Sequence, residues 1–248
     1  MPRFCLFFVA ANTGLLYINV DLPLLLLAVV PGLLISYAIF RADKYDREPL
    51  GPLLLCFFMG AATTVPVVLI ERWAYGWIGV PPFHLGQTAI LAFGILAIVE
   101  EVAKFLLLLL LVYPRKFFNE PLDGIVYAVL IAMGFATLEN VVYAGRFGLH
   151  TTLVRALTAV PAHLAFAVIQ GYFAGLAKFD PPNESRLLLR GLVLAILLHG
   201  SYDLLIMQNL SQWLAVVGTL ALYGCLVYCS HLVRDHQDHS PFRNNDDG

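Results

Sequence analysis

The stretch AIVEEVAKFLLLLLLVYPRK, residues 97–116, places three charged side chains inside an apolar run. Glu100, Glu101 and Lys104 lie near its start, and the run is long and apolar enough to cross a bilayer. A charge at mid-bilayer costs about 2.5–3.5 kcal/mol even on a lenient insertion scale, so it is normally paired, protonated or directed into a cavity. The fold must therefore bring partners to these three side chains.

The composition of the whole chain is that of an integral membrane protein. Of its 248 residues, 60% are hydrophobic and 13% are charged, and the mean hydropathy is +0.79. Soluble domains have about 25% charged residues. The net charge of −2 gives no reason to expect nucleic acid as a partner, and the apolar composition makes the lipid bilayer the expected surroundings.

Apolar runs predict an all-α, polytopic transmembrane helix bundle with about eight spans, since a spanning helix needs about 20 mostly apolar residues. The candidate spans are residues 4–19, 22–40, 51–70, 88–113, 123–145, 152–177, 187–207 and 211–233. If the short first run does not span, the bundle has seven spans. We expect one transmembrane domain over residues 1–234 and a polar cytoplasmic tail over residues 235–248.

Lys and Arg residues predict that both termini are cytoplasmic. With that orientation, the outer side carries only Arg72, Arg146 and Arg155, and the other loop cations fall inside. We expect Arg155 to extend toward the membrane interface rather than to join a site. The loop RADKYDREP, residues 41–49, mixes charges of both signs and predicts a turn held by salt bridges.

Four acidic residues fall well inside the predicted spans, while the others fall in predicted loops, at the first residue of a span or in the tail. The four are Glu100, Glu101, Glu139 and Asp203. His163 and His199 lie in equally apolar surroundings, and Asn140 directly follows Glu139. Such intramembrane polar residues normally face a bundle interior or a cavity with a function.

Helical spacing predicts which of these side chains share a face. Lys104 lies one turn after both Glu100 and Glu101, so one cation can partly neutralise two carboxylates. His199 and Asp203 are also one turn apart, a spacing at which a carboxylate can orient an imidazole or join it on a metal ion.

The depths of these residues agree although their helices alternate in direction. At about 1.5 Å per residue, Glu139 lies roughly 9 Å from the outer end of its span, His199 roughly 12 Å and His163 roughly 16 Å. Glu101 lies near the middle of its span. The polar residues therefore share one level between the midplane and the outer leaflet.

Four motifs in order resemble the signature blocks of the PrsW family of intramembrane proteases, which is similar to the CAAX prenyl endopeptidases. The motifs are EEVAK (100–104), FATLEN (135–140), His163 in PAHLAF, and HGSYD (199–203). The resemblance implies cleavage of a membrane-anchored protein, in the founding members an anti-sigma factor cut on its extracytoplasmic side. It also implies the inner membrane of a bacterium.

Peptide hydrolysis needs an activated water, a donor to the oxyanion and a proton donor for the leaving amine. In a first mechanism, Glu100 or Glu101 is the general base beside a divalent metal ion, for which we expect zinc. Its ligands would be a set of imidazoles and carboxylates that leaves one position for water: Glu139, His163 and His199, with or without Asp203.

A second mechanism uses no metal ion. Glu100 or Glu101 then activates water directly, and His163, His199 and Asn140 donate hydrogen bonds to the oxyanion. Lys104 would hold the glutamate pair in either mechanism.

Two other function classes use similar residues. Intramembrane Glu and His form proton relays in proton- or ion-coupled transporters, although the inverted repeats of many transporters are not visible here. A membrane lipid hydrolase could use the same polar cluster. Single-pass peptides and lipids offered as substrates separate these classes, because a transporter forms no product and a lipid hydrolase forms only lipid products.

Overall fold

The chain folds as a bundle of long helices, as its apolar runs predicted. A computed structural model describes residues 3–10, 14–78 and 84–243. Its elements are β1 (Arg3–Ala10), β2 (Gly14–Asp21), α1 (Leu22–Ala42), α2 (Leu50–Ile78), α3 (Leu85–Ala89), η1 (Ile90–Ala97), α4 (Ile98–Leu111), α5 (Pro121–Leu157), α6 (Ala159–Lys178), η2 (Pro181–Asn183), α7 (Glu184–Met207) and α8 (Gln212–Asp238). Five helical segments of the described chain are long and apolar enough to cross a membrane: Leu22–Ala42, Leu50–Ile78, Pro121–Lys178, Pro181–Met207 and Gln212–Asp238.

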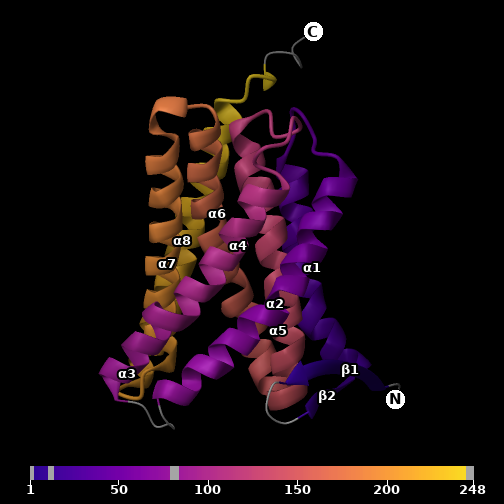
Figure 1. Cartoon of the computed structure of the whole chain (residues 1–248), viewed down its shortest axis with the longest axis vertical. Helices are drawn as coiled ribbons and strands as arrows, with labels where there is room; N and C mark the ends of the chain where they lie inside the picture. Colours follow the sequence, from indigo (N-terminus) through magenta and orange to yellow (C-terminus); the bar gives the residue numbers. More distant parts are fainter. Residues whose placement is uncertain (1–2, 11–13, 79–83, 244–248) are drawn as a thin grey trace.

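The N-terminal segment forms a β-hairpin in place of the helix expected at residues 4–19. β1 pairs antiparallel with β2, from Arg3 opposite Asp21 to Ala10 opposite Gly14. Each strand has eight residues, too few to span a bilayer as a helix, and both are rich in residues that favour strands. The hairpin lies at the end of the bundle opposite to the C-terminus (Figure 1). Our expectation that both termini share one side depended on the missing helix, so it does not follow from this fold.

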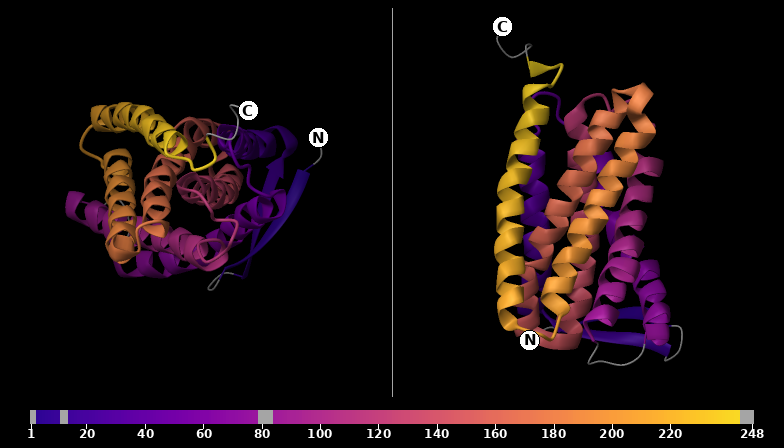
Figure 2. Two further views of the ribbon diagram at one scale, coloured as in Figure 1. Left: turned by 90° about the horizontal axis from the view of Figure 1, so that it is seen from above. Right: turned by 90° about the vertical axis from the view of Figure 1, so that its left-hand side faces the viewer.

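Helices α5 and α6 form the centre of the bundle, and the other helices surround them (Figure 2). Small residues permit their close approach. A Cβ atom on Gly124 would lie 2.4 Å from the carbonyl oxygen of Gly171, and a Cβ atom on Gly171 would lie 2.4 Å from that of Gly124. This packing of glycine against backbone is typical of membrane helices, which have no hydrophobic drive to associate.

The predicted span at residues 88–113 is a helix with one wider segment. It begins with α3, continues through the π-helix η1, and ends with α4. Single turns of π-helix are frequent at functional sites because they re-aim the side chains that follow. Here Glu100, Glu101 and Lys104 of α4 are all buried in the interior of the bundle.

Buried carboxylates gather where the loop after α1 meets the start of α5. Asp43 accepts a hydrogen bond from the backbone N–H of Glu48, Glu48 accepts from the hydroxyl of Tyr127, and Glu120 accepts from that of Ser240. The described residues of this loop form no salt bridge, contrary to our prediction from RADKYDREP, because the carboxylates turn inward onto these donors.

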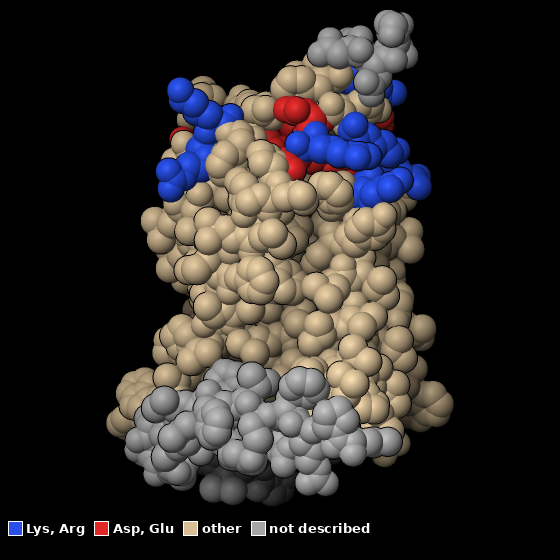
Figure 3. Space-filling view, turned by 90° about the vertical axis from the view of Figure 1, so that its right-hand side faces the viewer, with Lys and Arg blue, Asp and Glu red and all other residues tan. Residues whose placement is uncertain are grey.

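Lys and Arg side chains gather near this same end on the face that Figure 3 shows. Exposed Lys44 and Arg47 belong to the loop, and exposed Arg234 lies on α8. Helix α8 continues through Asp238, beyond the domain boundary that we placed at residue 234, and His236 is buried against the ring of Tyr172.

The pH dependence of stability should report on the buried carboxyl group of Glu120. Burial raises its pKa from 4.5 to about 7, and the Asp123 carboxylate adds to the shift. Because the folded chain then binds a proton that the unfolded chain has lost, this contribution is largest below about pH 4.5 and falls as the pH rises to about 7. Between about pH 5 and about pH 7, the Tm of the wild type should fall about 5 °C more than that of Glu120→Gln. Asp238→Asn, at an exposed acid, should behave like the wild type, and parallel curves for all three proteins would contradict the assignment.

Candidate active site

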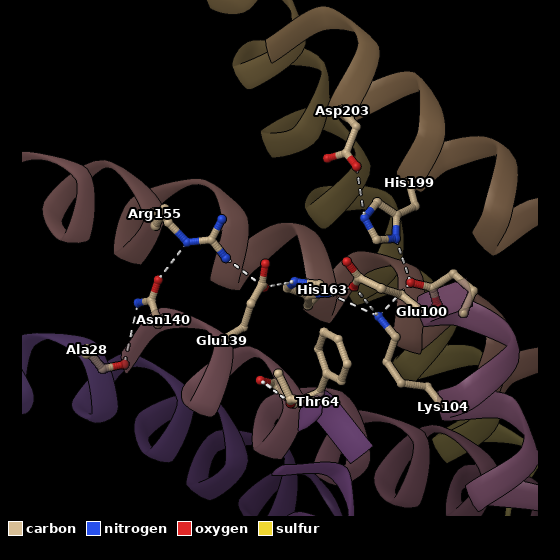
Figure 4. A network of polar contacts seen from close by, with 12 residues as sticks. Ala28, Thr64, Glu100, Lys104, Glu139, Asn140, Arg155, His163, His199 and Asp203 are labelled. Carbon is tan, nitrogen blue, oxygen red and sulfur yellow. Dashed lines mark hydrogen bonds and ion pairs between the residues drawn. The ribbon is translucent and has the colours of Figure 1, made fainter. Parts of the chain in front are cut away.

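The charged residues predicted from the sequence meet between four helices (Figure 4). Glu100, Glu101 and Lys104 come from α4 and Glu139 comes from α5, while His163 comes from α6 and His199 and Asp203 come from α7. Direct polar contacts connect them in one network, although they are spread over about a hundred residues of sequence.

Lys104 is the centre of this network. Its Nζ lies 2.7 Å from Glu101 Oε1 and 3.4 Å from Glu100 Oε2, as the helical spacing predicted. It also lies 3.2 Å from His163 Nδ1 and 4.7 Å from the centre of the Phe135 ring. Only 3% of Lys104 is exposed, so protein groups rather than water compensate its charge.

His163 is held in one orientation by partners on both ring nitrogens. Lys104 can only donate, so Nδ1 of His163 must be the acceptor. Nε2 therefore carries the proton and donates to Glu139 Oε2 at 3.1 Å. His163 thus has no free nitrogen for a metal ion in this arrangement.

His199 lies between two carboxylates. Its Nδ1 is 2.8 Å from Glu101 Oε1, and its Nε2 is 3.4 Å from Asp203 Oδ2. Its ring stacks on Phe166, with 4.8 Å between the ring centres and 17° between the planes. A neutral imidazole has one N–H and can donate to only one of two carboxylates, so this position favours a group that carries a proton on each nitrogen or binds a cation.

Arg155 joins the network, which corrects our expectation that it extends toward the interface. Its Nη2 lies 2.6 Å from Glu139 Oε2. The helix α5 bends at Gly148, where φ is 72° and ψ is −161°, and the bend turns the following residues back toward the site. A residue with a Cβ rarely adopts this backbone conformation, so glycine is the residue suited to the bend.

Asn140 supports Arg155 and does not face the reacting groups. Its Oδ1 accepts a hydrogen bond from Arg155 Nε at 3.0 Å, and its Nδ2 donates to the carbonyl oxygen of Ala28 at 3.4 Å. The residue is fully buried. The structure therefore does not place Asn140 as an oxyanion donor, the role that the metal-free mechanism gave it.

A cavity of about 380 Å³ opens beside the network. Glu100, Glu139, His163, His199 and Asp203 line it, whereas Glu101 and Lys104 lie behind its wall. The cavity is large enough for a short peptide segment, since small-molecule sites occupy about 300–1,000 Å³.

Glu71 and Tyr75 also line this cavity, and the sequence analysis missed both. We ended the candidate span 51–70 at residue 70, but α2 continues to Ile78, beyond Tyr75. The apolar and aromatic residues after Arg72 were the signal that could have extended the span. Glu71 Oε1 is buried and has no hydrogen-bond partner among the described residues, so it adds another carboxylate to the site.

The donor atoms that converge most closely differ from the metal ligands that we predicted. Among the described residues, the group with ligand atoms all within 4.8 Å of one another is Glu100, Glu101 and His199. Imidazole nitrogens and carboxylate oxygens are both donor types that bind zinc. Of the predicted set, His199 belongs to this group. Both ring nitrogens of His163 and Oε2 of Glu139 contact Lys104, Arg155 or each other.

Comparisons with known proteins agree on one family. Residues 48–230 match the family described as "PrsW family intramembrane metalloprotease". Protease PrsW of Clostridioides difficile is 35% identical over 192 residues, which cover 75% of this chain and 80% of the relative. Protease PrsW of Bacillus subtilis is 35% identical over 191 residues, with coverage of 75% and 83%. No solved structure gives a significant match. With its charged residues joined between α4, α5, α6 and α7, the chain belongs to the PrsW family of intramembrane proteases.

Proposed function

We propose that the cavity is the catalytic site of an endopeptidase that cuts a membrane-anchored protein, of the anti-sigma-factor type that the family resemblance implies. The observation that carries this proposal is the unequal environment of the two adjacent glutamates. Glu101 is fixed by Lys104 and His199, whereas Glu100 lines the cavity and holds one partner loosely. A fixed carboxylate beside a free one is the arrangement that an orienting group and a general base require.

Glu100 is the general base in this mechanism. Its Oε2 lies 3.4 Å from Lys104, and its Oε1 makes no hydrogen bond among the described residues. It takes a proton from water, and the water oxygen attacks the scissile carbonyl carbon. Glu101 orients Lys104 and His199 and does not itself reach the substrate.

Arg155 and His199 act on the intermediate that this attack forms. The Nη1 group of Arg155 has no hydrogen-bond partner among the described residues, while its other nitrogens are held by Glu139 and Asn140. It stabilises the oxyanion with a donor that is already oriented. His199, which lines the cavity, gives its proton to the leaving amide nitrogen.

The donor chemistry of Glu100, Glu101 and His199 also fits a divalent metal ion, for which we expect zinc. These residues would hold it, and Glu100 would then be a ligand instead of the base. The surplus of carboxylates in the site also favours a cation, because Lys104 and Arg155 are the only fixed cations that contact them among the described residues. A bound ion would supply a Lewis acid for the carbonyl oxygen of the substrate.

We place the cavity toward the extracytoplasmic side of a bacterial inner membrane. The basic residues around the C-terminal end of the bundle favour a cytoplasmic position for that end (Figure 3). His150 and Thr151 line the cavity and follow the bend of α5 at Gly148, near the opposite end of the bundle. With seven crossings rather than eight, the hairpin would then lie outside.

Glu100→Gln and Glu101→Gln should have different effects, because only Glu100 is the base. Glu100→Gln should keep the Tm of the wild type and lose about a hundredfold or more in cleavage rate, because a positioned base contributes about 10²–10⁴. Glu101→Gln should lower both the cleavage rate and the Tm, because Lys104 and His199 lose the carboxylate that they share. The measurement is cleavage of a panel of single-pass peptides by purified protein, with Asp238→Asn as a control. Full activity in Glu100→Gln would remove it from this role, and cleavage of lipids alone would indicate the lipid hydrolase.

The ion pair between Arg155 and Glu139 can be tested by removing one charge or both. Arg155→Met leaves a buried carboxylate without its cation, which should destabilise the fold by about 3–5 kcal/mol. Combining it with Glu139→Gln should restore most of the Tm but not the cleavage rate, because the oxyanion donor is still absent. An active double variant would show that Arg155 has only a structural role.

Metal content distinguishes the two mechanisms. Purified wild type should contain about one divalent ion per chain, and His199→Ala should lose it. His231→Ala, at an exposed histidine on α8, is the matched control and should retain the ion. A fully active, chelator-resistant wild type without metal would favour the metal-free mechanism with Glu100 as base.

A further inference from the structure

A second cavity, of about 470 Å³, lies between α1, α6 and α8, away from the catalytic residues. Its walls are Ile35 and Ile39 of α1 and Leu226 and Val233 of α8, and Val168 of α6 lies at its floor. Helix α1 packs mainly on α5, and α8 packs mainly on α6 and α7, so an apolar groove remains between them. This groove faces the surroundings of the bundle, where acyl chains are the solvent.

The end of the groove nearest the C-terminus has a different chemistry. Lys44 and Arg234 line it there, both are exposed, and neither forms an ion pair with a described residue. Gln237 donates a hydrogen bond to the carbonyl oxygen of Ala42 and so joins α8 to α1 above the groove. The groove is therefore apolar along its length and doubly cationic at one closed end.

We propose that this groove binds one anionic phospholipid, with its phosphate between Lys44 and Arg234 and an acyl chain along α6. Charge selects the occupant, because two cations without protein partners match an anionic headgroup and a basic pocket between membrane helices is a known form of such a site. An acyl chain can pack against the apolar walls and has no backbone polar groups. A non-helical peptide in the groove would leave backbone N–H and C=O groups without hydrogen bonds. The volume falls within the range of about 300–1,000 Å³ for small-molecule sites.

The headgroup contacts can be tested on the full-length protein in detergent, titrated with phosphatidylglycerol or phosphatidylcholine and followed by native mass spectrometry. The wild type should retain phosphatidylglycerol preferentially. Lys44→Gln combined with Arg234→Gln should weaken its binding about 25-fold, about fivefold for each cation. Lys116→Gln combined with Arg186→Gln removes the same charges from exposed positions outside the groove and should have no effect. Equal retention of the two lipids by the wild type, or equal losses in both double variants, would overturn the proposal.

The apolar part of the site has its own test. Ala38 lines the groove from α1, so Ala38→Trp should fill it and reduce binding of phosphatidylglycerol while leaving both cations in place. Leu33→Trp adds the same ring at an exposed position of α1 outside the groove and should bind like the wild type. Displacement of the lipid by a single-pass peptide or by a second copy of the protein would assign the groove to a protein helix instead.

Discussion

The structure depends on the ammonium group of Lys104, which neutralises carboxylates that could not otherwise remain together inside a membrane protein. It contacts Glu100 and Glu101 within α4 and reaches His163 on α6. Breaking a buried charge pair by removing one partner is strongly destabilising, because the other charge is left without compensation. The positions of α4 and α6 are therefore linked by electrostatics as well as by packing. This link holds the catalytic groups on the two helices in fixed positions.

Arg155 is a second cation that neutralises a carboxylate, that of Glu139, on the other side of the site. Arg155 lies sixteen residues after Glu139 on α5, too far along a straight helix for contact. The bend at Gly148 brings the two together, and Asn140 holds the guanidinium in place. Backbone geometry at one glycine thus decides whether Glu139 has a counter-charge.

The sequence predicted the parts of this site that depend on local geometry. The spacings of Lys104 from Glu100 and Glu101, and of His199 from Asp203, follow from the period of a helix, and the structure has these contacts. The partners of Arg155 and Asn140 were missed because they depend on a bend that spacing does not reveal. Glu71 was missed because the end of α2 was placed too early. The hairpin was missed because short apolar runs fit a strand as well as a helix.

The two histidines have different environments although their motifs look alike. His163 bridges a cation and a carboxylate, so one neutral tautomer satisfies both partners. His199 bridges two carboxylates, so a neutral ring can donate to only one of them. A proton or a divalent cation resolves that mismatch, and either one gives His199 a charge-dependent role that His163 cannot have. The asymmetry arises from the position of Lys104, which is close enough to His163 to contact Nδ1 and leaves His199 to the acidic side chains.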